Sequence, residues 1–529
     1  MAHDTDTHDY VIVGAGSAGC VLANRLTADG EDSVLLLEAG GPDEKREIDI
    51  PAGFSDLFQS EVDWNFHTTP QAELNDREMY WPRGEVLGGS SSINAMIYIR
   101  GHPDDYDGWA AEGNDGWGWE EMLPYFRRAE HNERLSGPTH GTDGPLNVAD
   151  QRDPNELSEA FVDAAAEVGY PRTDDFNDGT QTGVGLYQVT QKGGKRHSTA
   201  TAYLKPALDR PNLDAVTHAH VTRVRFDGDR AVGVEYEHEG QRKTADAASE
   251  VILCGGAVNS PQLLLLSGVG PADHLAEHGI DVVADRPGVG GNLQDHLNAG
   301  VIFECTEPLS LAKAESIWNL AKYFLRKQGM LTSNVAEAGG FARTDDDLDA
   351  PDVQFHFGPA YFLRHGFEES PVDHAFSLGV VQLRPESRGR ISLASDDPLD
   401  DPVIDPRYLT EEEDWEVMFD GVEMCREILR ADAFAPYRGE ELLPGPDVDS
   451  REGVADLVRE YAETLYHPVG TCKMGDDDEA VVDDRLLVHG VEGLRVVDAS
   501  IMPQITRGNT NAPTIAIAEK AADLIAEDA

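Results

Sequence analysis

A glycine-rich turn near the N-terminus has the residue types and the spacing that bind a dinucleotide. It occupies residues 14–19, follows a short apolar run and opens a helical pattern. Gly14 permits the tight turn, Gly16 lets the backbone approach a pyrophosphate, and Gly19 allows the helix to pack closely on the strand. A second apolar run ends in Glu38, where a carboxylate can hold ribose hydroxyls. We therefore expect a nucleotide with its phosphates at the N-terminus of the helix.

A second segment rich in glycine and serine, residues 81–94, is suited to the same ligand. Its bare backbone N–H groups and hydroxyls can bind a pyrophosphate or the edge of a flavin. A tight turn before a buried strand explains the same composition, and the residues alone leave both interpretations open. Residues 288–292 also contain glycines, but no apolar strand directly precedes them and no apolar helix follows. We therefore do not expect a second nucleotide.

Five segments of the chain resemble motifs of the glucose–methanol–choline (GMC) oxidoreductase family. They occur in the family's order and span nearly the whole chain: residues 83–101, 256–270, 288–296, 466–475 and 508–514. The resemblance implies FAD as the cofactor and the oxidation of an alcohol to an aldehyde by hydride transfer to the flavin. The motifs look most like those of the alcohol and choline dehydrogenase branch. The implied electron acceptor is a quinone or another carrier, with dioxygen, and therefore an oxidase, as the alternative.

The same resemblance implies an α/β fold (α+β overall), with a Rossmann-like FAD-binding domain and an inserted antiparallel-sheet substrate domain. We expect the FAD domain to be discontinuous, with residues 1–155, 210–300 and 465–529, and the substrate domain to hold residues 156–209 and 301–464. Periodicity predicts helices at 157–168, 411–429 and 452–465, and strands at 231–236 and 390–393.

Oxidation of an alcohol requires a base for the hydroxyl proton and a fixed hydrogen-bond partner for the oxygen. Of the 18 histidines, His467 lies in the family's histidine–proline segment, and the resemblance makes it the base. The partner in this family is a histidine or asparagine some forty residues later. Counting back from the C-terminal helix places it at Asn509 rather than Asn511. We expect Asn511 to order the turn into that helix.

The resemblance also assigns positions along the cofactor. Val221 is expected on the adenine side, Asn94 and its neighbours along the flavin, and Asp498 where the site closes, although a helix cap is another role for Asp498. Relatives with a covalent flavin carry a histidine where this chain has Ile93, so we expect non-covalent FAD. The residues expected at the cofactor are Gly14, Gly16, Ser17, Gly19, Glu38, Val86, Gly89, Ser90, Asn94, Ala95, Val221, Tyr466, Asp498, Ala499 and Asn511. No metal ligand is expected.

The composition is strongly acidic. The formal net charge is -56, and only ten of the 42 basic residues are lysine. Self-repulsion of this size favours unfolding unless salt screens it, so the pattern indicates a halophilic, salt-accumulating source, with an acidic mesophilic protein as the alternative. A negative surface also repels phosphate backbones, and we expect no nucleic-acid partner.

The N-terminus lacks a basic stretch and an apolar core of a signal peptide, and no apolar run reaches the roughly 20 residues of a membrane span. We therefore expect a cytoplasmic protein. Five scattered cysteines, with no pair at two-residue spacing, argue against both a disulfide framework and a cysteine zinc site.

The substrate is less determined than the cofactor. A choline-specific dehydrogenase would need a carboxylate and aromatic faces, for which Glu315 and Trp318 are available. A hydroxynitrile lyase and a non-catalytic flavoprotein are the remaining functional alternatives. Residues 313–327 combine an apolar helical stripe with four basic side chains. They predict either a lid helix over the substrate entrance or a face for weak peripheral contact with a membrane or an acidic acceptor protein.

Overall fold

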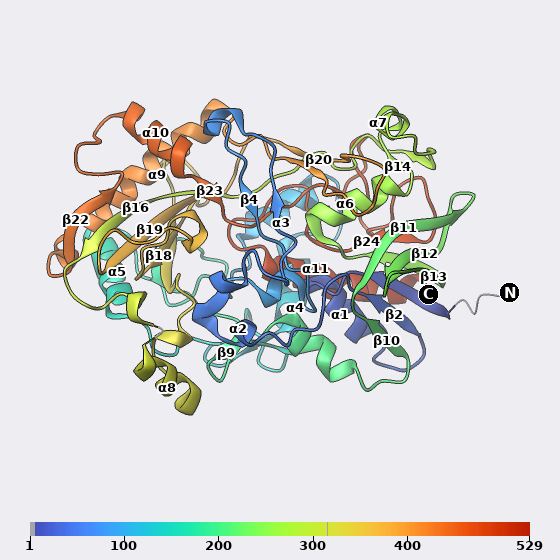
Figure 1. Cartoon of the computed structure of the whole chain (residues 1–529), viewed down its shortest axis with the longest axis horizontal. Coiled ribbons are helices and arrows are strands. Elements are labelled where there is room, and N and C mark those ends of the chain that lie inside the picture. Colours follow the sequence, from blue (N-terminus) through green and yellow to red (C-terminus); the bar gives the residue numbers. More distant parts are fainter. Residues whose placement is uncertain (1–5, 315) are drawn as a thin grey trace.

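Two β-sheets organise the protein, and each carries its own helices (Figure 1). The computed structural model describes residues 6–314 and 316–529. Apolar residues from the strands of each sheet belong to a large hydrophobic cluster, one for each sheet. The molecule is therefore bipartite, and the segments that connect the two sheets cross between them several times.

The first sheet, at the right of Figure 1, contains a parallel core. Its parallel strands lie in the order β10 (Leu213–Val216), β2 (Val34–Leu37), β1 (Asp6–Val13), β13 (Gln241–Leu253) and β24 (Leu494–Val496). The long β13 extends past this core and pairs antiparallel with β12 (Arg230–His238), which pairs with β11 (Ala219–Asp227). Four helices pack around this sheet or on one another: α1 (Ser17–Leu26), α4 (Trp119–Ala129), α6 (Gly256–Leu266) and α11 (Asn511–Asp528). This is the expected Rossmann-like arrangement.

The second sheet is wholly antiparallel. Its order is β22 (Arg438–Leu443), β16 (Leu297–Cys305), β19 (Ala375–Gln382), β18 (Val353–Gly358), β17 (Ala338–Ala342) and β7 (Gly183–Leu186), with β23 (Glu463–Thr464) also paired to β16. Helix α9 (Glu412–Arg430) packs on β19, α5 (Glu156–Glu167) packs on β17, and α10 (Arg451–Tyr461) packs on α9. This agrees with the antiparallel sheet that the resemblance implies.

The remaining elements are short. The helices are α2 (Arg46–Asp49), α3 (Pro103–Ala111), α7 (Ala272–Glu277) and α8 (Ile317–Arg326). Short 3-10 and π turns also occur. The described residues form five two-stranded sheets as well: β3 (Phe66–His67) with β4 (Tyr80–Trp81), β5 (Glu130–Asn132) with β6 (Leu146–Val148), β8 (Gln191–Lys192) with β9 (Lys195–Arg196), β14 (Val269–Gly270) with β15 (Ala284–Asp285), and β20 (Arg390–Ser392) with β21 (Val403–Asp405). None of the helices that the structure describes is both long and apolar enough to cross a membrane.

The predicted helices at 157–168 and 411–429 are confirmed as α5 and α9, and the predicted strands are confirmed as β12 and β20. The helix predicted at 452–465 ends earlier, at Tyr461, because the following residues form β23 and pair with β16. Local periodicity cannot register such a pairing, since the partner strand lies far away in the chain.

The predicted domain boundaries stay a prediction. At two of them, however, the structure continues from one predicted domain into the other. Strand β16 runs across the boundary expected at residue 300. The turns at residues 200–207, which were assigned to the substrate domain, pack instead in the core of the first sheet. There the hydroxyl of Tyr203 donates to the carboxylate of Glu519 on α11 (2.8 Å).

Candidate active site

One large cavity extends from the carboxyl ends of the parallel strands to the second sheet. Its wall includes the β1–α1 turn, the end of β2 and the start of α6 on one side. On the other side it includes β16, β18 and β19 and the loop that follows β23. Ligands of open α/β sheets bind at the carboxyl ends of the strands, so the first wall lies where a nucleotide is expected.

The glycines of the first turn are required by close backbone contacts. Gly14 has φ +97°, and a Cβ there would lie 2.6 Å from the carbonyl oxygen of Cys254. A Cβ on Gly19 would lie 1.9 Å from the carbonyl oxygen of Gly14, so this glycine has the packing role that its spacing predicts. A Cβ on Gly89 would lie 2.8 Å from Cα of Gly16. The two glycine-rich segments therefore touch, and Gly14, Gly16 and Gly89 line the cavity with bare backbone.

Glu38 lies on the cavity wall at the end of β2. Its carboxylate accepts hydrogen bonds from the backbone N–H groups of Ala15 (2.7 Å) and Gly40 (3.0 Å). Burial raises the pKa of Glu38 to about 7, and the two backbone hydrogen bonds oppose that rise. This carboxyl group therefore joins the glycine turn to β2 in addition to facing the place expected for the ribose.

Asn511 and Asp498 order the backbone around the cavity. Ser17 donates from its hydroxyl to Oδ1 of Asn511 (2.7 Å), which connects the first residues of α1 and α11. Asp498 accepts from the backbone N–H groups of Ser500 and Gly256, both at 2.8 Å. It is thus the cap that the sequence allowed, and it also lines the cavity, as do Ser17 and Asn511.

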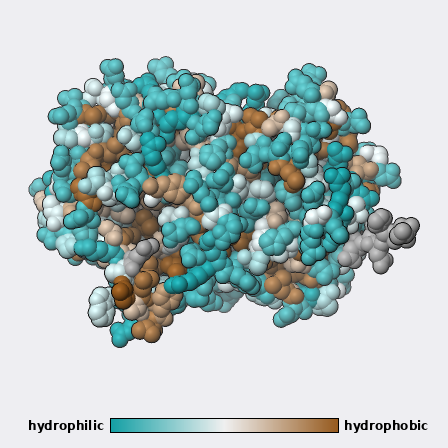
Figure 2. All heavy atoms as spheres, viewed as in Figure 1, coloured by the Kyte–Doolittle hydropathy of each residue, from teal (hydrophilic) through white to brown (hydrophobic). Residues whose placement is uncertain are grey.

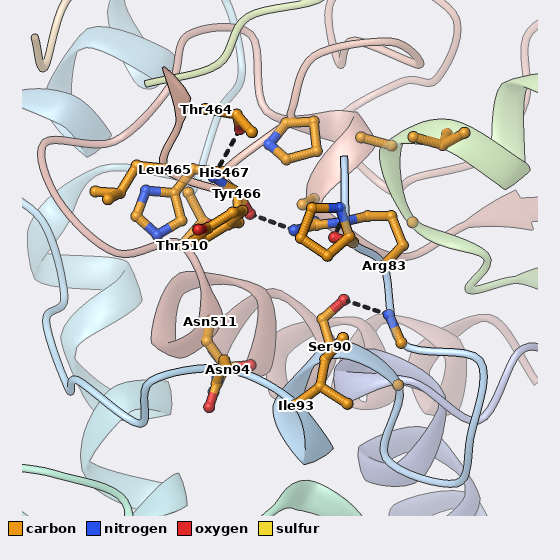
Figure 3. Close-up of a pocket in the computed structure, with 18 of the residues that line it drawn as sticks. Arg83, Ser90, Ile93, Asn94, Thr464, Leu465, Tyr466, His467, Thr510 and Asn511 are labelled. Carbon is orange, nitrogen blue, oxygen red and sulfur yellow. Dashed lines mark hydrogen bonds between the residues drawn. The ribbon is translucent and has the colours of Figure 1, made fainter. Parts of the chain in front are cut away.

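The second glycine-rich segment supplies a further part of the wall. Ser90, Ile93, Asn94 and Ala95 line the cavity. Figure 3 shows Ser90, Ile93 and Asn94 opposite the loop that carries Tyr466 and His467. Val86 does not line it. Its side chain is fully buried in a separate apolar cluster, so the cofactor contact expected there is corrected. The remaining expected residues on the wall are Val221, Tyr466 and Ala499.

His467 and Asn509 meet at the cavity although they come from different loops. His467 follows β23, Asn509 precedes α11, and Nδ2 of Asn509 lies 3.3 Å from Nε2 of His467. Asn511 is directed to Ser17 instead. Of the two asparagines, the one adjacent to His467 is therefore Asn509.

The hydrogen bonds around this pair assign its protons. Gln354 donates from Nε2 to Oδ1 of Asn509 (3.2 Å), which leaves the Asn509 amide N–H to donate to Nε2 of His467. The proton of a neutral His467 is then on Nδ1, which lies 2.9 Å from Nδ1 of His296. His296 completes the chain by donating from Nε2 to the carbonyl oxygen of Leu383 (3.2 Å). Nε2 of His467 is consequently the unprotonated nitrogen, and its lone pair accepts from Asn509 at the cavity wall.

Burial and neighbouring charges keep the imidazoles of His467 and His296 uncharged. Burial, followed by His296, His356 and Arg83, holds the pKa of His467 well below its ordinary value. Burial likewise lowers the pKa of His296 to about 3. Both imidazoles are therefore uncharged at neutral pH, and Nε2 of His467 is the basic nitrogen.

Asp295 holds the backbone of the catalytic loop. Its Oδ1 accepts from the N–H of His467 (2.7 Å), while Oδ2 accepts from the hydroxyls of Thr464 (2.6 Å) and Tyr408. Arg83 donates to the carbonyl oxygen of Tyr466 (2.5 Å). Neither Asp295 nor His296 was assigned a role from the sequence. The available signal was that these two adjacent ionisable residues end the 288–296 segment.

Comparison with known proteins identifies the family. The N-terminal GMC oxidoreductase family model matches residues 8–298, and the C-terminal one matches residues 385–518. The chain belongs to the GMC oxidoreductase family. The resemblance noted in the sequence motifs is confirmed.

Several GMC oxidoreductases are similar over nearly their whole length. An alcohol dehydrogenase [acceptor] of Pseudomonas putida is 50% identical, and the match covers 98% of this chain and 95% of the relative. An oxygen-dependent choline dehydrogenase of Burkholderia vietnamiensis is 48% identical, with coverage of 98% and 94%. Among solved structures, pyridoxine 4-oxidase from Mesorbium loti has a TM-score of 0.90 at 34% identity, covering 98% of this chain and 99% of that one. Formate oxidase of Aspergillus oryzae has a TM-score of 0.93 at 27% identity, covering 100% and 99%.

FAD is the cofactor of this family, and the cavity wall fits it. The touching glycine turns leave backbone exposed at the N-terminus of α1, where a pyrophosphate is stabilised. Toward the second sheet, Nε2 of His356 and Oδ1 of Asn298 are buried on the wall without a hydrogen-bond partner among the described residues, as expected where a polar ligand binds. Among all the residues that the structure describes, no cluster of three or more His, Cys, Asp or Glu side chains could hold a metal ion.

The substrate-pocket and lid interpretations of residues 313–327 need correction. Trp318 is 84% exposed and does not line the cavity, so it is neither a pocket aromatic nor a core residue. No side chain of α8 lines the cavity, which argues against the lid interpretation. Glu315 lies outside the described residues.

Proposed function

We propose that this GMC oxidoreductase is an FAD-dependent alcohol dehydrogenase that oxidises a primary alcohol to the aldehyde, with His467 as the base and Asn509 as its partner. The observation that carries the proposal is the contact on the cavity wall between Nε2 of His467, the nitrogen that the hydrogen bonds assign as unprotonated, and Nδ2 of Asn509 (3.3 Å). The 50% identity to an alcohol dehydrogenase [acceptor] supports the same substrate class.

The two side chains divide the work on the substrate hydroxyl. FAD, when bound, supplies the acceptor for the hydride that leaves the alcohol carbon. A substrate hydroxyl that enters between the two side chains replaces their contact. Its proton then passes to Nε2 of His467, and Nδ2 of Asn509 donates a hydrogen bond to the oxygen as negative charge develops on it. His296 keeps the other His467 nitrogen protonated, so the basic nitrogen faces the cavity. Asp295 fixes the backbone of His467 and limits the movement of the ring away from the substrate.

The wall near the catalytic pair favours an uncharged, apolar alcohol. Its side chains toward the second sheet are mainly apolar, and they include Phe54, Phe58, Ile302, Val335, Phe362, Leu363 and Leu443. Such a wall stabilises a hydrocarbon chain or ring by excluding it from water.

Choline is the second candidate because choline dehydrogenases are 48% identical to this chain. Glu463 is a carboxyl group on the wall with Tyr461 and Tyr466 nearby in sequence, as a quaternary ammonium would need. Arg364 lines the same wall, however, and burial raises the pKa of Glu463 to about 7. A partly neutral carboxyl group beside a guanidinium binds a cation weakly, so we favour the neutral alcohol.

We further propose that FAD binds without a covalent link. Ile93 lines the cavity beside Asn94, and an isoleucine side chain has no nucleophile that could attack a flavin. For the reoxidation step we propose a quinone or another carrier, with dioxygen as the alternative. A hydroxynitrile lyase would bind FAD but would not reduce it.

Anaerobic reduction of the bound FAD tests the proposal. The purified holoenzyme is mixed without oxygen with a panel that includes ethanol, octanol, benzyl alcohol and choline, in high salt. We expect the flavin absorbance near 450 nm (a general property of oxidised flavin) to bleach fastest with an apolar primary alcohol. Admission of dioxygen or of a quinone analogue then distinguishes the acceptors. No bleaching by any alcohol, with cyanohydrin cleavage instead, would replace this function by the lyase.

A further inference from the structure

Helix α8 (Ile317–Arg326) presents an apolar surface to solvent at one end of the molecule. Three of its side chains are almost fully exposed, Ile317 (83%), Trp318 (84%) and Leu325 (83%), and Phe324 is 42% exposed. Only Tyr323 of this helix is buried. Figure 1 shows α8 projecting at the lower left, and Figure 2 shows apolar residues gathered at the same place. We name these four exposed side chains the α8 patch.

The patch is not a random scatter of surface residues. Successive helical residues are rotated by about 100°, so Ile317, Trp318, Phe324 and Leu325 fall on one outward arc, while Leu320 and Tyr323 face the body. The hydroxyl of Tyr323 donates to the carbonyl oxygen of Asp49 (3.1 Å), which anchors the helix from its inner side. Large contiguous apolar patches on a protein surface mark interaction sites.

Basic side chains border the patch in a protein whose formal net charge is -56. Lys313, Lys322, Arg326 and Lys327 lie within this stretch, where Glu315 is the only acidic residue between positions 309 and 330 of the sequence. Lys313, Lys322 and Arg326 are exposed and form no ion pair with a residue that the structure describes. Nζ of Lys327 lies over the ring of Tyr323 (4.0 Å).

We propose that the α8 patch docks this enzyme on an anionic lipid surface. The exposed apolar side chains enter the interfacial region of the lipid, and Lys322, Arg326 and their neighbours attract its negative headgroups. The acidic remainder of the protein is repelled by the same surface, so only the α8 end can approach closely. Charge complementarity requires an anionic partner, and the exposed apolar side chains select a lipid over an acidic protein, because a protein offers no apolar phase in which Ile317, Trp318 and Leu325 can insert.

The location of the patch connects it to the cavity. Tyr323 and Leu320 pack in a cluster with Ile50, which directly precedes the 3-10 turn Pro51–Leu57. That turn carries Phe54, a residue of the cavity wall. Docking would therefore bring one part of the cavity wall near the lipid, and an apolar alcohol could enter the cavity from there. The entry of the alcohol rests on the proposed function, whereas docking itself does not.

Vesicle binding by the holoenzyme tests the proposal. Co-sedimentation is measured with vesicles of phosphatidylglycerol and phosphatidylcholine, and with vesicles of phosphatidylcholine alone, at 0.1 M and 1 M NaCl. At 0.1 M salt we expect the protein to bind the anionic vesicles at least about tenfold more tightly than the vesicles of phosphatidylcholine alone. Salt at 1 M should weaken it, because the Debye length falls to about 3 Å.

Two sets of variants separate the contributions of charge and apolar surface. The double variant Lys322→Glu with Arg326→Glu should lose the preference for anionic vesicles. Its affinity for these vesicles should be at least about tenfold lower than that of the parent protein. Ile317→Ser with Trp318→Ser and Leu325→Ser should abolish binding to both vesicles. The matched controls are Leu399→Ser, at a side chain that is 57% exposed elsewhere, and Arg172→Glu, an exposed arginine outside this stretch; both should bind like the parent protein.

A second readout does not depend on sedimentation. Trp318 is 84% exposed, so brominated lipid should quench part of the tryptophan emission, and Trp318→Phe should remove most of that quenching. Reduction of FAD by alcohol in detergent-free solution should be the same in all these variants, because none of the residues touches the cavity. A failed alcohol assay with intact vesicle binding would refute the function alone.

Three results would overturn the docking proposal. The first is parent protein that binds neither vesicle. The second is a dimer that the serine variant converts to monomer without any lipid binding, which would make the patch an interface between two copies. The third is binding to polyglutamate but not to vesicles, which would indicate an acidic protein partner.

Discussion

Nδ1 of His467 lies 2.9 Å from Nδ1 of His296, and the two imidazoles are nearly perpendicular, with an interplanar angle of 84°. Only one of these nitrogens can carry the shared proton while both rings stay neutral. Because Asn509 donates to the opposite nitrogen of His467, the proton belongs to Nδ1 of His467 and His296 is the acceptor. A buried histidine thus sets the tautomer of the base, a role that a carboxylate has in other enzymes.

The first prediction concerns the base itself. His467→Ala should slow reduction of FAD by alcohol roughly 100-fold or more, because no other group accepts the hydroxyl proton at that position. Anaerobic stopped-flow absorbance measures the rate. His238→Ala, on β12 and away from the cavity wall, is the control and should reduce at the parent rate. A His467→Ala protein with bound FAD and near-normal reduction would remove this residue from the role.

The pH dependence follows from the depressed pKa of His467. A base with an ordinary histidine pKa would be half protonated near pH 6.5, and its activity would fall below that pH. Burial and neighbouring groups hold the pKa of His467 well below this value, so the base stays unprotonated as the pH falls. The rate constant for FAD reduction should therefore be nearly constant from pH 8 to pH 6. Half-loss of the rate near pH 6.5 would contradict the buried environment that the structure gives to this ring.

Asn509 and Asn511 should differ in what their loss affects. Asn509→Ala removes the donor next to His467 and should slow FAD reduction by about tenfold or more, since one donor to a developing oxyanion has at least that effect. Asn511→Ala breaks the hydrogen bond from Ser17 between α1 and α11, and should weaken FAD binding more than it slows reduction. Stopped-flow rates and FAD titration of the apoprotein measure the two effects. The opposite order would mean that the assigned partner is two residues off.

The sequence could predict the parts of the site that local rules determine, and not those that depend on distant packing. Gly14 and Gly19 were predictable because the spacing of a tight turn and its helix is local. His296 was not, since its contact with His467 joins positions 171 residues apart and leaves no periodicity. The exposure of Trp318 was missed for a related reason: an apolar helical stripe has the same pattern whether it faces a core or solvent. The early end of α10 also depends on a partner strand far away in the chain.

The bond between protein and FAD has a direct chemical test. Because Ile93 supplies no nucleophile at the expected position, FAD should be released when the holoenzyme is denatured in acid. After centrifugation the yellow colour should be in the supernatant, and mass spectrometry of the pellet should show the mass of the unmodified chain. Colour that stays with the precipitated protein, together with an added flavin mass, would contradict non-covalent binding.

The acidic composition predicts that salt stabilises the fold. With a formal net charge of -56, repulsion between carboxylates raises the free energy of the compact state more than that of the expanded one. Raising KCl from 0.1 M to 1 M shortens the Debye length from about 10 Å to about 3 Å and reduces this repulsion. The Tm of the holoenzyme in differential scanning calorimetry should therefore rise by about 5 °C or more. Sucrose at matched osmotic strength stabilises by exclusion from the protein surface and not by screening, so it separates the two effects. A Tm that is unchanged or lower in KCl would mean that the surface carboxylates are already compensated within the fold, and the halophilic interpretation of the composition would be wrong.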